Sequence, residues 1–84
     1  MYYVYILKSE IKEKTYVGFT NNLERRIKEH NSVRSKYTSK YVPWRIIYQE
    51  KLATLAEAKA RELYLKSAAG RKFRKKLFNY NMPT

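Results

Sequence analysis

Arg26 and His30 stand four residues apart in a segment whose pattern predicts a helix, so their side chains share one side of it. Leu23 and Ile27 define the apolar stripe of this helix. His30 falls on the stripe and Arg26 lies at its edge, whereas Arg25 points to solvent. A guanidinium can hold a phosphate through two parallel hydrogen bonds. A solvated or ion-paired arginine and a hydrogen-bonded core histidine would produce the same pattern.

Glu62 is a carboxylate on the apolar side of a later predicted helix, which Leu55, Ala58, Leu65 and Ala69 mark. A buried carboxylate is costly unless it is paired with a cation or bound to a metal ion. Two explanations stay open at this point. Glu62 either binds a metal ion or forms an ion pair with a neighbouring cation: Arg26, Lys59 or Lys66.

The residue types that are missing exclude several kinds of site. All seven acidic residues are glutamates, His30 is the only histidine, and there is no cysteine. A zinc finger is therefore excluded, and so is a pair of catalytic histidines within one chain. A Ser-His-Asp triad would need Glu in place of Asp, and a two-metal nuclease site would have to use scattered glutamates. An enzyme acting on phosphodiesters would have to draw on tyrosine, arginine or His30.

The net charge indicates a polyanionic partner. Nineteen Lys and Arg face seven acids, which gives a formal charge of +12 on 84 residues. This excess favours DNA, RNA or, less strongly, an anionic membrane surface; a solvated basic surface without a partner is the remaining alternative. Lys and Arg contact phosphates, and tyrosines stack on bases. Two stretches are therefore candidate nucleic-acid-binding segments: Arg34, Lys36, Tyr37 and Lys40, with Tyr41, and Arg71, Lys72, Arg74, Lys75 and Lys76.

Three strands are expected. Residues 2–7 are aromatic or β-branched and apolar on both faces, which is typical of a central strand covered on both sides. Residues 15–19 predict a second strand that forms a hairpin with the first. Gly18, near the end of this strand, allows a close approach of the backbone. Residues 44–50 predict a third strand, whose alternation places three apolar side chains on one face: Trp44, Ile46 and Tyr48.

The first helix is expected to begin after Asn21, which would cap it, with Glu24 reaching back to the cap, and to run to about His30. Residues 31–43 are polar and basic and end in Pro43, so they predict a mobile loop.

Two further helices follow. Thr54 and Glu57 form a capping box at the start of a helix that runs to about Ser67. Gly70 is expected to break it, and residues 71–80 predict a third, basic helix. The order β-β-α-β-α-α predicts an α+β fold for one domain spanning residues 1–84. It would contain a small, three-stranded, mainly antiparallel sheet with flanking helices.

Together, these residues resemble the signature of the GIY-YIG family of endonuclease domains. The match is carried, in order, by Tyr3-Val4-Tyr5, Tyr16-Val17-Gly18, Leu23-x-x-Arg26-x-x-x-His30 and Glu62. It extends from Tyr3 to about Leu77. The chain is most similar to the short, stand-alone bacterial members; the same domain occurs in the excision-repair nuclease subunit, in homing endonucleases and in some restriction enzymes. The resemblance implies hydrolysis of DNA phosphodiester bonds.

The resemblance also implies a role for each matching residue. Tyr5 and Tyr16 line the catalytic face, and Tyr16 helps to activate the attacking water. Arg26 holds the scissile phosphate and offsets its developing charge, and His30 lies near the nucleophile. Glu62 binds one divalent metal ion, usually Mg²⁺, with Mn²⁺ as the alternative.

Three positions bear on how fully the family pattern is kept. Gly18 closes the second triad and lets the backbone approach the site, as in the family. Tyr3 stands where the first triad carries glycine, which changes local backbone freedom without removing a reactive group. Arg74 stands about twelve residues beyond Glu62, where the family often carries an asparagine that helps near the site. This last departure concerns the catalytic rate more than the fold.

Two classes of function stay open: a metal-dependent endonuclease, and a non-catalytic basic nucleic-acid-binding module on the same fold. The retained residues favour the nuclease, because a pure binder has no evident use for a carboxylate that faces a phosphate site. Single modules bury roughly 600–1,000 Å², so we expect structure or context, and not base sequence, to select the target. We expect a cytoplasmic monomer without a transmembrane segment, which a protein partner could direct.

Overall fold

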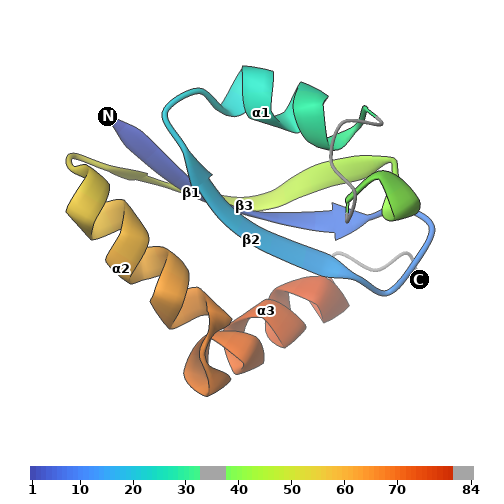
Figure 1. Cartoon of the computed structure of the whole chain (residues 1–84). Coiled ribbons are helices and arrows are strands. Elements are labelled where there is room, and N and C mark those ends of the chain that lie inside the picture. Colours follow the sequence, from blue (N-terminus) through green and yellow to red (C-terminus); the bar gives the residue numbers. More distant parts are fainter. Residues whose placement is uncertain (33–37, 81–84) are drawn as a thin grey trace.

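Strands and helices follow one another in the predicted order β-β-α-β-α-α, and the α+β class is confirmed. The computed structural model of the chain describes residues 1–32 and 38–80. The elements are β1 (Tyr2–Ser9), β2 (Thr15–Thr20), α1 (Leu23–His30), the 3-10 turn η1 (Thr38–Tyr41), β3 (Trp44–Leu52), α2 (Leu55–Lys66) and α3 (Ala68–Tyr80). The sheet is antiparallel with the order β2-β1-β3. Helix α1 covers one face, and α2 and α3 cover the other (Figure 1).

Strand β1 is the central strand, as its doubly apolar sequence predicts. Residues 4–7 are all buried, and alternate side chains enter different cores. Val4 and Ile6 pack with Ala58 and Leu65 on the side of α2 and α3. Tyr5 and Leu7 pack on the side of α1. The strand therefore joins two small hydrophobic cores, one on each face of the sheet.

A bulge in β3 overturns one detail of the predicted alternation. Ile6 pairs with Tyr48 and Leu7 with Ile46, so β3 carries one extra residue at this point. An extra residue moves the following side chains to the other face of the sheet. Trp44 and Ile46 accordingly pack on the α1 side, but Tyr48 packs on the opposite side. The prediction of one common face was wrong for Tyr48.

The helix starts follow side-chain caps. Asn22, and not Asn21, caps α1, because its side chain accepts a hydrogen bond from the backbone N–H of Arg25 at 3.0 Å. Thr54 and Glu57 form the predicted capping box at the start of α2. None of the helices in residues 1–32 and 38–80 has the length and apolar character needed to cross a membrane.

Gly70 does not break a helix, contrary to expectation. Helix α2 ends at Lys66, Ser67 adopts an extended conformation, and α3 begins at Ala68. Gly70 is buried inside the first turn of α3, where an added Cβ would overlap the carbonyl oxygens of Tyr64 and Leu65. The missing side chain thus lets α3 cross close to the end of α2.

Candidate functional site

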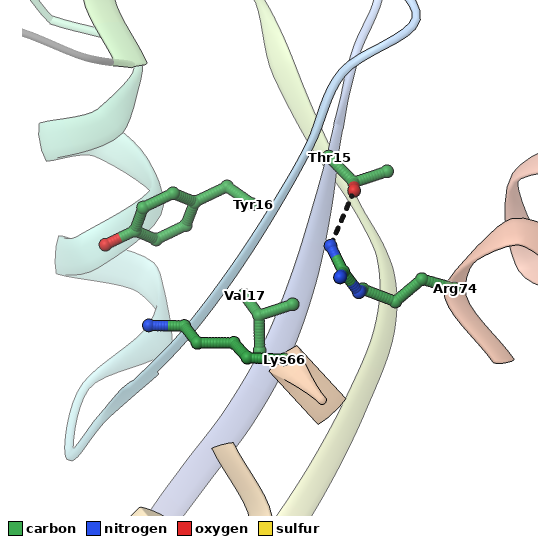
Figure 2. A pocket seen from close by; sticks show the side chains of 5 residues that line it. All are labelled: Thr15, Tyr16, Val17, Lys66 and Arg74. Carbon is green, nitrogen blue, oxygen red and sulfur yellow. Dashed lines mark hydrogen bonds between the residues drawn. The ribbon is translucent and has the colours of Figure 1, made fainter. Parts of the chain in front are cut away.

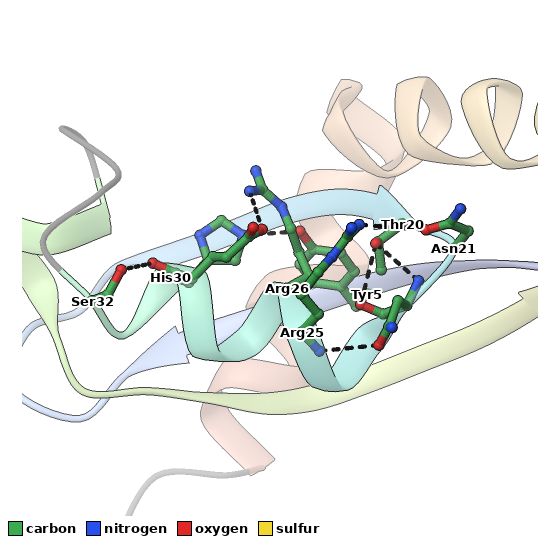
Figure 3. Close-up of polar contacts among 9 residues, drawn as sticks. Tyr5, Thr20, Asn21, Arg25, Arg26, His30 and Ser32 are labelled. Atoms are coloured by element: carbon green, nitrogen blue, oxygen red, sulfur yellow. Dashed lines mark hydrogen bonds and ion pairs between the residues drawn. The ribbon is translucent and has the colours of Figure 1, made fainter.

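Four of the residues singled out in the sequence gather between the sheet and α1. Tyr5 of β1 lies opposite Gly18 of β2 in the strand register, and Tyr16 shares the same face two residues earlier. The rings of Tyr16 and His30 are 4.7 Å apart between centroids, and those of Tyr5 and Tyr16 are 6.4 Å apart. Figure 3 shows Tyr5, Arg26 and His30 side by side. Strand pairing and the turn into α1 therefore suffice to assemble this cluster.

A buried hydrogen bond joins the hydroxyl of Tyr5 to Nε2 of His30 at 2.9 Å. Burial raises the pKa of Tyr5 to about 12, although the hydrogen bond and charge of Arg26 oppose the shift. Burial, reinforced by the positive charge of Arg26, lowers the pKa of His30 to about 4. Near neutral pH the imidazole is therefore uncharged and the hydroxyl keeps its proton. The hydrogen bond therefore joins two uncharged groups.

Gly18 gives this hydrogen bond its space. An added Cβ would lie 2.6 Å from the hydroxyl oxygen of Tyr5 and 3.0 Å from a ring carbon of Tyr16. The backbone of β2 can therefore approach both tyrosines only because residue 18 has no side chain.

Arg26 lies at the solvent edge of the cluster, as its place on the helix predicts, whereas Arg25 is exposed. The side chain of Arg26 is 35% exposed and forms an ion pair with Glu29 at 3.1 Å. Burial on its own would lower the pKa of Arg26, but hydrogen bonds to Tyr5 and Glu29 raise it further, so the guanidinium stays charged. Arg26 also lines a pocket of about 360 Å³ with Phe19, Thr20 and other residues, so its charge is open to a ligand.

Glu62 lies on the side of α2 that faces the sheet, in line with the buried Ala58 and Leu65. Its carboxylate side chain is 18% exposed and pairs with Lys66 at 3.6 Å. Its negative charge also contributes, as the smallest influence, to the raised pKa of Tyr5. The helix that carries Glu62 thus lies on the opposite face of the sheet from His30 (Figure 1), yet the carboxylate is within electrostatic reach of Tyr5.

A metal ion at Glu62 would have few side-chain ligands. Within residues 1–32 and 38–80, no three His, Cys, Asp or Glu side chains gather where they could share an ion. Mg²⁺ often uses only one or two carboxylates and completes its shell with water and substrate phosphate. A single, partly exposed carboxylate fits such an ion and does not fit zinc, which needs three or four protein ligands.

A family model described as the GIY-YIG catalytic domain matches residues 1–78. The chain belongs to the GIY-YIG family. This is a family of nuclease domains, so the match confirms the predicted family and the coarse functional class.

The GIY-YIG family assignment is supported by relatives that are UPF0213 proteins. One from Clostridium perfringens is 48% identical over 67 residues, which cover 79% of this chain and 71% of the relative. One from Staphylococcus haemolyticus is 39% identical over 67 residues, covering 79% and 80%. The UPF0213 protein YazA of Bacillus subtilis is 33% identical over 72 residues, covering 84% and 72%.

The two basic segments differ in how the structure places them. Arg34, Lys36 and Tyr37 lie outside the described residues. Lys40 is exposed on η1, whereas the ring of Tyr41 packs edge-on against Trp44 in the α1-side core. Four cations of α3 are exposed, namely Arg71, Lys72, Lys75 and Lys76. Arg74 is half-buried instead and reaches β2, where it donates a hydrogen bond to Thr15 at 3.3 Å (Figure 2).

The sequence predicted only one of the two roles that the structure gives to Lys66. Its position four residues after Glu62 identified it only as a potential ion-pair partner, and this pairing is present. The spacing could not show that Lys66 also lines a pocket with Tyr16 and Arg74, because that depends on how α2 and α3 pack against β2. In Figure 2 the side chains of Lys66 and Tyr16 extend to the same side of β2.

Proposed function

We propose that this chain is a metal-dependent endonuclease that hydrolyses phosphodiester bonds of DNA and is directed by structure or context. The observation that carries the proposal is the gathering of Tyr5, Tyr16, Arg26 and His30 on one face of the sheet, within electrostatic reach of Glu62. Such a cluster combines an anion-binding group, a candidate base and a carboxylate within a small area.

Arg26 would bind the scissile phosphate. Its guanidinium is charged, partly exposed and held by Glu29 at 3.1 Å, so it is oriented before substrate arrives. A fixed guanidinium can donate two hydrogen bonds to a phosphate and offset the charge that develops on its oxygens.

Tyr16, and not Tyr5, would act on the attacking water. Tyr5 is 1% exposed, its hydroxyl is hydrogen-bonded to His30, and its pKa is raised to about 12, so it keeps its own proton near neutral pH and is unsuited to accept another. Tyr16 is half-buried and lines an open pocket, so its hydroxyl can meet water and substrate. The cations Arg26 and Lys66 lie near this ring, where they would add positive charge beside a bound phosphate. His30 is then a positioning residue that holds both rings.

Glu62 would hold the metal ion, and Mg²⁺ suits this position best because it can bind through one carboxylate together with water and substrate phosphate. When bound, the ion supplies positive charge to phosphate oxygens and lowers the pKa of bound water. Glu62 would have to exchange its pairing with Lys66 for the metal, which would leave the ammonium group available to an anion.

The alternative function, a non-catalytic nucleic-acid-binding module, has one observation in its favour. Glu62 already has a cationic partner in Lys66, so a structural ion pair would also explain a carboxylate at this position. The exposed cations of α3 would serve a binder as well as a nuclease.

The test is a titration of Mg²⁺ or Mn²⁺ into the chain and into Glu62→Gln, followed by amide shifts and by nicking of branched and duplex DNA. Glu57→Gln is the matched control, because Glu57 lies on the exposed side of the same helix and Gln also serves a capping box. We expect metal-dependent shifts near Glu62 and Tyr16, and nicking that only Glu62→Gln abolishes. Binding of DNA without a metal response and without nicks would refute the nuclease and leave the binding module.

A further inference from the structure

A pocket of about 320 Å³ opens beside Tyr16 at the edge of the sheet, where β2 pairs with β1 on one side and, among the described residues, with no strand on the other. Thr15, Tyr16 and Val17 line it from β2, Lys66 from the end of α2, and Arg74 from α3 (Figure 2). Among these five, Tyr16 acts in the chemistry proposed above, and Lys66 enters it only as the ion-pair partner of Glu62. The remaining polar groups of the pocket are two cations and a hydroxyl.

Arg74 is fixed in this pocket by neutral groups alone. Its Nε donates to the backbone carbonyl of Leu65 at 3.0 Å, and its Nη1 donates to Oγ1 of Thr15 at 3.3 Å. These bonds use two of the five N–H donors of a guanidinium. No carboxylate of the described residues pairs with Arg74, and none of residues 63–84 is acidic. Within residues 1–32 and 38–80, this half-buried guanidinium therefore has no counter-anion.

Lys66 adds a second positive charge that is only partly balanced. Its side chain is 50% exposed, and its single ion pair with Glu62 has an N–O distance of 3.6 Å, longer than a tight charged hydrogen bond. Two cations and one carboxylate therefore leave a positive balance at the pocket. This balance grows when a metal ion takes over Glu62.

The shape and location fit a phosphodiester of the substrate backbone. A fork of N–H donors, an ammonium group and a hydroxyl together match the oxygens of one phosphate. Thr20, which lines the pocket of Arg26, lies four residues after Tyr16 on β2, or about 13 Å at the usual rise. Both pockets open along the same strand, so a nucleic-acid strand that follows β2 can reach both within a few nucleotides.

We propose that Thr15, Lys66 and Arg74 form a second anion subsite beside Tyr16, which binds a phosphodiester next to the one that is cleaved. The inference rests on the proposed function, because it assumes a nucleic-acid substrate at Tyr16. It assigns the two cations to holding the strand in register with Tyr16, and it gives Arg74 a function at the position where the family often has asparagine.

Binding without metal tests this subsite separately from cleavage. Labelled duplex DNA is titrated in EDTA into the chain and into Arg74→Gln, Lys66→Gln and Lys59→Gln, at several salt concentrations. Lys59 is an exposed cation on the same helix as Lys66 and is not among the residues that line the pocket, so it is the matched control. We expect Arg74→Gln and Lys66→Gln each to weaken binding about tenfold and to reduce the salt slope by about one. Lys59→Gln should weaken binding by no more than about twofold.

Amide shifts of residues 15–17 locate the effect. At the same DNA concentration the shifts should be clearly smaller in Lys66→Gln than in the unchanged chain. Lys66 is half-exposed, so we expect the substitution to leave the fold intact. Equal losses in all three variants would overturn the subsite. Shifts with inorganic phosphate but none with DNA would also overturn it, because the pocket would then bind only the free anion. A chain that shows the expected binding pattern but never nicks DNA with metal would refute the nuclease and keep the subsite.

Discussion

Acid should destabilise this fold through one residue, His30. The imidazole is completely buried and its pKa is lowered from 6.5 to about 4, because burial and the charge of Arg26 both oppose its protonation. The unfolded chain takes up this proton near pH 6.5, whereas the folded chain takes it up only near pH 4. Stability is therefore complete above pH 6.5 and is lost as the pH falls toward 4.

The size of the effect follows from the gap between the two pKa values. At about 1.4 kcal/mol for each pH unit, the full loss is about 3 kcal/mol, and about 2.5 kcal/mol of it should appear between pH 7.5 and pH 4.5. The assay is urea unfolding across this range for the unchanged chain and for His30→Gln. Glutamine offers both a donor and an acceptor to the hydroxyl of Tyr5 and does not titrate, so the pH dependence should shrink by about this amount.

The same residue offers a direct second readout, because it is the only histidine of the chain. Its imidazole proton signal should not titrate above about pH 5 in the folded protein. Equal pH dependence for the chain and for His30→Gln, together with a histidine signal that titrates near pH 6.5, would refute the buried, neutral imidazole. The link between Tyr5 and His30 would then have to be described differently.

Two glycines give further tests. Gly18→Ala should displace the hydroxyl of Tyr5, since the new Cβ would lie 2.6 Å from it. An unchanged His30 signal and unchanged nicking would show that β2 can accommodate a side chain at this position. Gly70→Ala should lower the free energy of unfolding by about 1–3 kcal/mol, because the Cβ overlaps the carbonyl oxygen of Leu65. An unchanged urea midpoint would mean that α2 and α3 can separate at this crossing without cost.

Much of the fold could be predicted because local patterns and packing agree. The central place of β1 follows from an apolar run on both faces, and the start of α2 follows from a capping box. The errors lie where packing decides. The β3 bulge that turns Tyr48 to the other face depends on pairing with β1, and Gly70 continues α3 because it lies at a helix crossing.

For the candidate site, too, helical spacing predicts some features, whereas others depend on tertiary contacts. The positions of Arg26 and His30 follow from helical spacing, and the inward place of Glu62 follows from its stripe. The hydrogen bond between Tyr5 and His30 and the pocket beside Tyr16 could not be predicted, because both depend on contacts between elements distant in sequence. Lys66 and Arg74 meet β2 only through the packing of two helices, which no spacing within one helix reveals.

The residues of the proposed site come from two separate parts of the chain. The first 30 residues supply four of them: Tyr5, Tyr16, Arg26 and His30. Glu62 and Arg74 belong instead to α2 and α3, the helices on the opposite face of the sheet. A local opening of α2 and α3 would therefore withdraw the carboxylate and the guanidinium in one step while the hairpin and α1 stay folded. The free energy of this opening sets the fraction of molecules with an assembled site, and amide hydrogen exchange in α2 would report it.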